Sequence, residues 1–308
     1  MELRLFLEFA VGFSMAGDDS DHESSITLLE GELGVGAHVM QRRDPVNRAE
    51  APECPSSRAA LHPRSFVIAT PHLISGPIKR PAVTLLVSLN ARPFNVAVPG
   101  FGGVEAHAAF VGAGQERVLR ARNCDLLSVN IEPGHVLFRP LQQALGERPL
   151  QRVPAAREVL DLLQLCFKAV VPGEPHLEIL VELCENAGFA VDRSLRPRNR
   201  ANELMATVDD AIPGRASLSQ LANTLRLSES RLSHLFVEEV GVPLRTYLLW
   251  RRYRLALSRL SSQTTFTQLA SDTGFADAAH LTRTFVGYLG FSPRRVVNSC
   301  FIQDLASR

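Results

Sequence analysis

The last third of the chain contains the same pattern twice, and this repeat limits the possible fold more than any other feature. Residues 217–243 reappear, with substitutions, as residues 265–293. Corresponding residues are 48 positions apart at the start of the repeat and 49 apart at Gly241 and Gly290, so the second copy has one extra residue near its turn. An internal repeat of this length indicates two copies of one supersecondary unit.

Each copy predicts a short helix, a tight turn and a longer helix. Ser217 with Gln220, and Thr265 with Gln268, have the spacing of capping boxes, in which a hydroxyl and an amide satisfy the first free N–H groups of a helix. In the second copy, Gly274 provides the permissive backbone that a turn needs.

The longer helices are expected over residues 229–240 and 278–289. Each has a polar N-cap before it, and a glycine C-cap followed by a proline after it. These signals are Ser228, Gly241 and Pro243 in the first copy, and Asp277, Gly290 and Pro293 in the second.

A helix, a turn and a second helix with a free polar face form a helix-turn-helix unit, whose second helix lies in the DNA major groove. Arginine can bond guanine, hydroxyls can bond several base edges, and alanine can touch the thymine methyl. The two histidines are candidates that packing or capping would explain equally well. The candidate base-contacting residues are Ser230, Arg231, His234, Ala279, His280 and Arg283.

Charge supports the same interpretation. Residues 215–296 contain 11 Arg, no Lys and five acidic residues, a net charge of +6, whereas the whole chain has a net charge of +1. Basic charge is thus concentrated in the segment that would meet phosphates. A helical repeat can also be a protein-interaction module, but the charge and the paired turns favour DNA.

Residues 204–296 resemble the DNA-binding domain of the AraC/XylS family of bacterial transcription regulators. The second copy is close to the family signature, with Gly274, Phe275, His280, Leu281, Phe285, Gly290, Pro293 and Arg294 in register. The resemblance implies seven helices in an all-α domain, with two helix-turn-helix units that bind successive major grooves of promoter DNA. It also implies contact with RNA polymerase.

The resemblance places a long connecting helix at residues 244–260. Its Tyr247, Leu248, Leu255 and Leu257 would pack between the two lobes. Its arginines Arg251, Arg252, Arg254 and Arg259 would face outward, toward phosphates or solvent. With the arginines after the second unit, the candidate phosphate-contacting residues are Arg251, Arg252, Arg294 and Arg295.

The first two thirds of the chain predict an α+β organisation, with a sensor or dimerisation domain at residues 1–196 and the DNA-binding domain at 197–308. Short apolar or alternating runs predict antiparallel strands, and helical periodicity predicts a helical hairpin before the join near residues 192–202. The strand segments are 82–91, 106–114, 115–122 and 124–133, and the hairpin lies within 154–189. The resemblance implies that the strands form a cupin-like β-barrel.

No motif for an enzyme, a metal site or a cofactor is present. His62, His72, His107 and His135 lack the close spacing that places two metal ligands on one strand. An unknown small organic effector in the barrel is the expected ligand. Arg42, Arg43 and Arg48 are weak candidates for holding an anionic effector, although a solvated loop explains them as simply.

The five cysteines form no paired motif, which favours neither a disulfide framework nor a zinc cluster and indicates the reducing cytoplasm. No apolar run reaches membrane-spanning length. The acidic residues of the N-terminal segment argue against a signal peptide, and a start codon assigned too far upstream is another explanation of that segment.

These observations predict a sequence-specific DNA-binding regulator, expected to be an activator, whose N-terminal domain senses a small effector, forms a homodimer, or does both. Control by a partner protein or by an anionic nucleotide is one alternative. A catalytic cupin fused to a DNA-targeting domain is another, although the interpretation favoured here is that the chain is not an enzyme.

Overall fold

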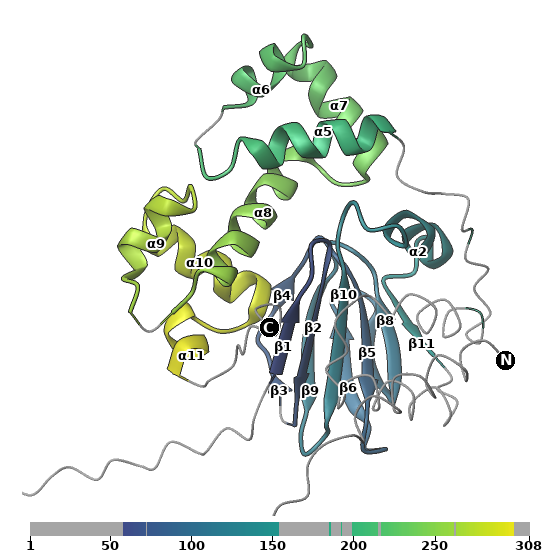
Figure 1. Ribbon diagram of the computed structural model, residues 1–308. Helices are drawn as coiled ribbons and strands as arrows, with labels where there is room; N and C mark the ends of the chain where they lie inside the picture. The colour runs from purple at the N-terminus through teal and green to yellow at the C-terminus, as the bar shows by residue number, and fades with distance from the viewer. Residues whose placement is uncertain are drawn as a thin grey trace, which may run out of the picture. The chain divides into compact units, whose positions relative to one another are not determined.

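The computed structural model describes residues 58–71, 73–153, 185, 192, 199–214, 217–261 and 263–298. All of these residues belong to one compact unit. Residues 58–153 form a β-rich domain with one helix, and residues 199–298 form a helical domain (Figure 1). The predicted helical hairpin and the predicted join between domains lie outside the described residues, except for positions 185, 192 and 199–202.

The β-rich domain consists of two antiparallel sheets. One has the strand order β1-β2-β10-β5-β8-β11, and the other has the order β3-β9-β6-β7 with β4 also paired to β9. The strands are β1 Arg58–Leu61, β2 Ser65–Thr70, β3 Leu73–Ile74, β4 Ile78–Lys79, β5 Val83–Ser88, β6 Phe94–Val98, β7 Gly102–Ala106, β8 Ala108–Val111, β9 Glu116–Ala121, β10 Leu126–Ile131 and β11 Leu150–Arg152.

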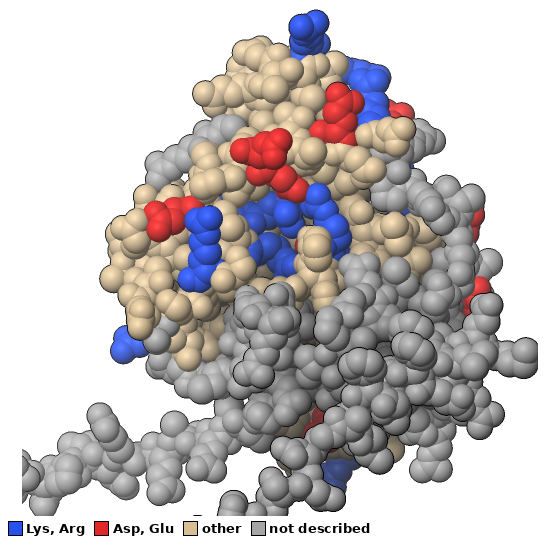
Figure 2. Space-filling view, viewed as in Figure 1, with Lys and Arg blue, Asp and Glu red and all other residues tan. Residues whose placement is uncertain are grey.

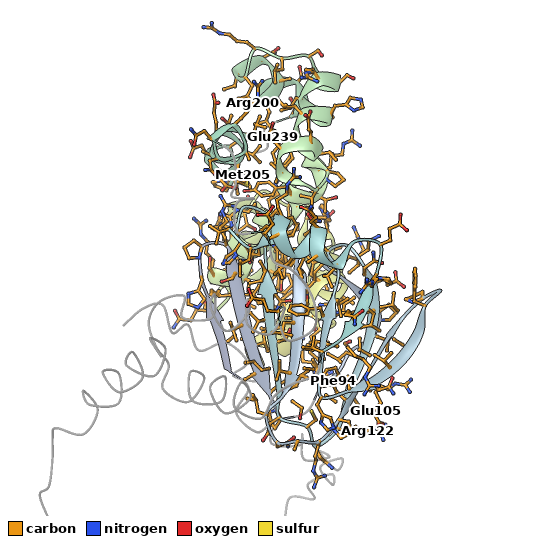
Figure 3. The ribbon with its side chains drawn as sticks, turned by 90° about the vertical axis from the view of Figure 1, so that its right-hand side faces the viewer. Phe94, Glu105, Arg122, Arg200, Met205 and Glu239 are labelled. Atoms are coloured by element: carbon orange, nitrogen blue, oxygen red, sulfur yellow. The ribbon has the colours of Figure 1, made fainter. Side chains whose placement is uncertain are left out.

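The described strands form the predicted β-rich domain, but no closed barrel is found among them. Within the described residues, the larger sheet ends at β1 and β11, and the path of the smaller sheet ends at β3 and β7. The strand segments themselves are confirmed, since β5, β8, β9 and β10 lie within the four predicted ranges. Figure 3 shows Phe94, Glu105 and Arg122 at the same end of this domain.

The central strands β2, β5 and β10 are buried on both faces. Alternate residues of each strand enter different clusters, as the two-residue period of a strand requires. On β5, Val83, Leu85 and Val87 join a cluster with the helical domain, whereas Leu86 joins the cluster between the sheets. These strands are therefore largely apolar and lack the strict alternation of a half-exposed strand.

The helices of the last third follow the predicted bounds closely. α7 and α10 coincide with the two predicted longer helices, and the connecting helix α8 ends two residues before its predicted end. The helices are α2 Phe138–Leu145, α5 Asn199–Asp210, α6 Leu218–Thr224, α7 Glu229–Val240, α8 Leu244–Ser258, α9 Phe266–Asp272, α10 Ala278–Leu289 and α11 Pro293–Asn298.

The two repeat copies start with similar caps of unequal completeness. Gln220 N–H donates to Ser217 Oγ over 3.2 Å, and Ser217 N–H donates to Gln220 Oε1 over 2.8 Å, which completes a capping box. In the second copy, Gln268 N–H donates to Thr265 Oγ1, but the Gln268 side chain bonds Asp272 instead. The second capping box is therefore only half formed.

The turn between the two helices explains the single extra residue. Arg226 and Gly274 both adopt a positive φ, of 55° and 79°. The next residue then donates back across the turn, from Leu227 to the Ala222 carbonyl and from Phe275 to the Ala270 carbonyl. Both turns are equivalent up to this point, so the extra residue of the second copy is the one that follows, immediately before its N-cap Asp277.

The connecting helix α8 packs against both helix-turn-helix units through its aromatic residues. Tyr247 lies 5.2 Å from Phe236 of α7, and Tyr253 lies 5.0 Å from Phe285 of α10, measured between ring centroids. Trp250 is fully buried between these positions. The predicted packing of the connector between two lobes is confirmed, although Tyr253 and Trp250 contribute more than Leu248 and Leu255, which are half-buried.

Candidate nucleic-acid interface

The two longer helices each bury one face and expose the other. The buried residues of α7 are Leu232, Leu235, Phe236 and Val240, and those of α10 are Leu281, Thr284, Phe285 and Leu289. None of the six candidate base-contacting residues is buried, and five of them are exposed.

The individual candidates differ in exposure. Ser230, Arg231, Ala279 and Arg283 are exposed, and none of them belongs to the buried core of its helix. His234 and His280 likewise lie outside the core. The His280 ring lies 5.2 Å edge-on from that of Phe275, so this histidine also has a packing role.

The N-terminus of α10 is fixed by Asp277, whose Oδ1 accepts a hydrogen bond of 2.6 Å from the backbone N–H of His280. This hydrogen bond lowers the pKa of the Asp277 carboxyl, and the nearby Arg283 charge acts in the same direction. Ser228 caps α7 in the same way, through the N–H of Arg231. The predicted caps are therefore confirmed in both copies, so both candidate faces begin at the same helical position.

The sequence reasoning missed one matched pair of residues on these faces. Val237 is 46% exposed and Val286 is 44% exposed, and they occupy equivalent positions, 49 residues apart. An exposed aliphatic side chain beside polar residues can contact a thymine methyl in the major groove. The signal that could have found them is an apolar residue outside the core-facing stripe at the same place in both copies.

The structure separates the candidate phosphate-contacting arginines into two kinds. Arg294 and Arg295 are exposed on α11, and the Arg295 guanidinium lies 4.6 Å from the centre of the Phe291 ring. Arg251 and Arg252 are half-buried on α8. A phosphate can reach Arg294 and Arg295 directly. Arg251 and Arg252 are less accessible, because α8 packs against its neighbours at these positions.

Arg251 belongs to a group of polar residues around Asp209 of α5, which we call the Asp209 cluster. Arg251 Nε lies 2.9 Å from Asp209 Oδ1, and Arg64 Nη2 lies 2.8 Å from Asp209 Oδ2. The Tyr247 hydroxyl donates to Asp209 Oδ1 over 3.1 Å. Since Arg64 lies in the loop between β1 and β2, this cluster links the β-rich domain to both α5 and α8.

Arg254 is more buried than Arg251, and the prediction that it faces outward is wrong. Its side chain is 8% exposed, and its Nε lies 2.8 Å from Oε1 of Glu132, which is 1% exposed. Its Nη2 also donates to the Ser65 carbonyl over 3.1 Å. Burial raises the pKa of Glu132, and the Arg254 charge opposes that shift. The sequence could not reveal this contact because Glu132 is more than a hundred residues away.

A cleft of about 300 Å³ lies beside these contacts, lined among others by His62, Asp209, Arg251 and Arg254. Figure 2 shows Lys and Arg side chains gathered in a hollow near the middle of the described surface, with acidic side chains beside them. The basic charge of the helical domain is therefore divided between exposed helix faces and a contact with the β-rich domain.

The other sequence candidates do not form a site among the described residues. No group of three or more His, Cys, Asp or Glu residues in that part of the chain could hold a metal ion. His72 and the loop with Arg42, Arg43 and Arg48 lie outside the described residues. Within the same described part, no helix combines the length and the apolar character needed to cross a membrane.

Comparison with known proteins agrees with this geometry. The family described as "Helix-turn-helix domain" matches residues 221–299. The arabinose operon regulatory protein of Escherichia coli (strain K12) is 29% identical over 131 residues, which cover 40% of this chain and 44% of that protein. The uncharacterized HTH-type transcriptional regulator YidL of the same organism is 31% identical over 103 residues, which cover 33% of this chain and 35% of that protein. The chain thus matches less than half the length of either relative.

Solved structures are similar over a larger part of the chain. A structure of ToxT from Vibrio cholerae has a TM-score of 0.51 at 11% identity, covering 77% of this chain and 98% of that chain. ToxT from Vibrio cholerae O395 bound to (E)-4-(8-methylnaphthalen-1-yl)but-3-enoic acid has a TM-score of 0.51 at 11% identity, covering 79% and 98%. At this identity the likeness concerns the fold alone.

These results define the class of the helical domain. The chain carries an AraC-type helix-turn-helix domain with two units, and the resemblance seen in its sequence is confirmed. This domain is joined to an N-terminal β-rich domain in the two-domain architecture of ToxT.

Proposed function

We propose that this protein is a sequence-specific DNA-binding transcription regulator, in which α7 and α10 enter successive major grooves of promoter DNA. The observation that carries the proposal is the pair of equivalent helices, each capped alike and each presenting arginine and small polar residues outside its buried stripe. Arginine on such a face can recognise guanine, and small side chains allow close approach to the bases.

The exposed arginines Arg294 and Arg295 at α11 are well placed to contact phosphates near the second unit. Arg251 and Arg252 remain candidates for the same role. For Arg251, contact with a phosphate requires release from Asp209. This difference makes α11 the better place to test phosphate contacts.

The proposal extends to the β-rich domain, which senses a small molecule. One ToxT structure contains an apolar carboxylic acid, and that likeness of fold supports the same kind of role here. The proposal also includes activation through RNA polymerase, a homodimer and a cytoplasmic location, which rest on the resemblance of the helical domain to the regulator family.

Selection of bound duplexes from a random DNA pool by the full chain tests the proposal directly. We expect enrichment of one asymmetric sequence with two conserved segments whose centres are separated by about one helical turn, roughly 10 base pairs. The matched control is the double variant Arg231→Ala, Arg283→Ala, which keeps the fold because neither side chain belongs to the buried core. Recovery of no common sequence by the full chain would contradict sequence-specific binding.

A further inference from the structure

The exposed face of α10 continues beyond the predicted base-contacting residues. Val286 lies three residues after Arg283 and seven residues after Ala279. Side chains at these spacings lie on the same side of a helix. All three residues are exposed, and Val286 is 44% exposed. Val286 therefore extends the candidate base-contacting stripe by nearly one helical turn.

Gly287 leaves this end of the stripe open. It is exposed, and a Cβ atom added to it would meet no neighbouring group within 4 Å. Glycine inside a helix destabilises the helix relative to alanine, and the β-branched Val286 is also a poorer helix former than alanine. Neither residue belongs to the buried core of α10. Helix stability and core packing therefore do not explain this pair, whereas close approach of another molecule to the backbone does.

The two longer helices differ in charge at this end. α10 contains no acidic residue. α7 has the same length, but its last turn contains Glu238 and Glu239. They directly follow Val237, the equivalent of Val286, and Glu238 is exposed. Because phosphates are negatively charged, these carboxylates disfavour approach of the DNA backbone to the end of α7, and nothing comparable opposes it at the end of α10.

The spacing along α10 places Val286 about one base-pair step from Arg283. A helix rises about 1.5 Å per residue, so three residues span about 4.5 Å along the axis. Successive base pairs are about 3.4 Å apart. In the major groove, a thymine presents its methyl group, which apolar side chains contact. The expected target of Val286 is therefore a thymine in the base pair next to the one that Arg283 contacts.

We propose that Val286 is a specificity-determining residue of the second unit, which contacts the methyl group of one thymine, and that Gly287 lets α10 come close enough to the base pairs for this contact. Val237, at the equivalent position of α7, does not make it. The inference rests on the proposed function, because it assigns a base preference to one residue of the proposed interface. The two half-sites should therefore differ, and only the second should contain a methyl contact that depends on this valine.

The test replaces thymine by deoxyuridine, one position at a time, in the duplex that the full chain selects. This change removes only the methyl group. We expect one position, next to the base pair that Arg283→Ala relaxes, to weaken binding of the unchanged protein about fourfold, the effect of one buried methyl-sized group. Val286→Ala should weaken binding to the thymine duplex by a similar factor. It should bind the thymine and deoxyuridine duplexes equally.

The matched control is Val237→Ala, because Val237 is 46% exposed at the same position of α7. This variant should keep the full sensitivity to deoxyuridine in the second half-site, and no position of the first half-site should lose its sensitivity. Neither alanine variant should melt at a lower temperature than the unchanged protein, because neither valine belongs to the buried core of its helix.

A second variant, Gly287→Ala, separates DNA binding from stability. Alanine should raise the melting temperature, because it is the better helix former and finds open space. It should nevertheless weaken DNA binding about tenfold, the effect of forcing an extra methyl group into a close contact. Glu238→Ala, at the equivalent position of α7, should not weaken DNA binding.

The inference is wrong if Val286→Ala remains as sensitive to deoxyuridine as the unchanged protein, or if Gly287→Ala binds DNA as tightly. It is also wrong if Val237→Ala loses a deoxyuridine response in the first half-site to the same extent. These results leave the proposed function in place when the full chain still selects a sequence and Arg283→Ala still relaxes one base pair. Selection of no sequence removes the proposed function and this inference together, so the two failures are distinguishable.

Discussion

The two helix-turn-helix units meet the β-rich domain in different ways, although their recognition helices are equivalent. At the end of α7, a side chain on Gly241 would begin 2.9 Å from Gln142 Oε1 of α2, so the neighbours are polar. At the end of α10, the neighbours of Gly290 are Ser75 and Ile78, beside a small cavity lined by two buried arginines. The C-terminal ends of these two equivalent helices therefore contact different kinds of residue in the β-rich domain.

This difference indicates where a signal from the β-rich domain can act. The contact at α7 includes a hydrogen bond from Arg139 Nη2 to the Glu238 carbonyl in an exposed position. Exposed polar contacts exchange with water at small net cost. The contact at α10 includes buried apolar surface and buried charge, so displacing it changes the free energy more. We expect the second unit to be the one that responds to a ligand.

The largest expected effect concerns the buried ion pair that anchors α8. Glu132→Ala leaves Arg254 buried without its carboxylate, and we expect a loss of about 3–5 kcal/mol in the free energy of unfolding. Urea denaturation measures it. Glu105→Ala, at an exposed position of β7, is the control and should change stability by less than about 0.5 kcal/mol. Equal losses in the two variants would show that the pair does not anchor the contact.

A smaller effect separates base contacts from phosphate contacts in the second unit. Arg283→Ala should cost about 1–3 kcal/mol for the preferred sequence and relax selectivity at one base pair. Arg294→Ala should weaken binding to all sequences about equally and reduce the salt dependence of the binding constant by about one unit of slope. Titrations with base-substituted duplexes at two salt concentrations measure both. Identical behaviour of the two variants would remove the distinction between their roles.

The smallest expected effect tests the exposed contact at α7. Arg139→Ala removes the hydrogen bond to the Glu238 carbonyl, and we expect a loss of about 0.5 kcal/mol, because water replaces the lost donor. Thermal unfolding measures it. A loss as large as that of Glu132→Ala would mean that the contact at α7 stabilises the fold as much as the buried ion pair does. Either helix-turn-helix unit could then respond to the β-rich domain.

The helical domain could be predicted from the sequence because its signals are local. The caps Ser217, Ser228 and Asp277 bond backbone groups three residues away, and the C-cap glycines end their helices at once. These signals fixed the helix bounds and kept the candidate base-contacting residues out of the buried stripes. Packing was one interpretation of His280 from the sequence, but its partner Phe275 could not be predicted, because that contact depends on how the turn folds back.

The contacts between the domains could not be predicted because their partners are distant in sequence. The sequence predicts Arg254 as a solvated residue of an arginine-rich helix. In the structure, however, it contacts Glu132 and the Ser65 carbonyl. The buried arginines Arg80 and Arg117 are not among the predicted site residues, since isolated arginines in a strand region usually lie at the surface. Local sequence patterns also could not predict whether the strands close into a barrel, because closure depends on which strands pair at the sheet edges.

Hydroxyl-radical footprinting of the full chain on its selected DNA tests the central claim most directly. If α7 and α10 both enter the duplex, protection will appear on one face as two patches about one helical turn, roughly 10 base pairs, apart. Arg231→Ala and Arg283→Ala will each weaken a different patch. A single protected patch, or two patches that both variants weaken equally, would contradict the use of two recognition helices.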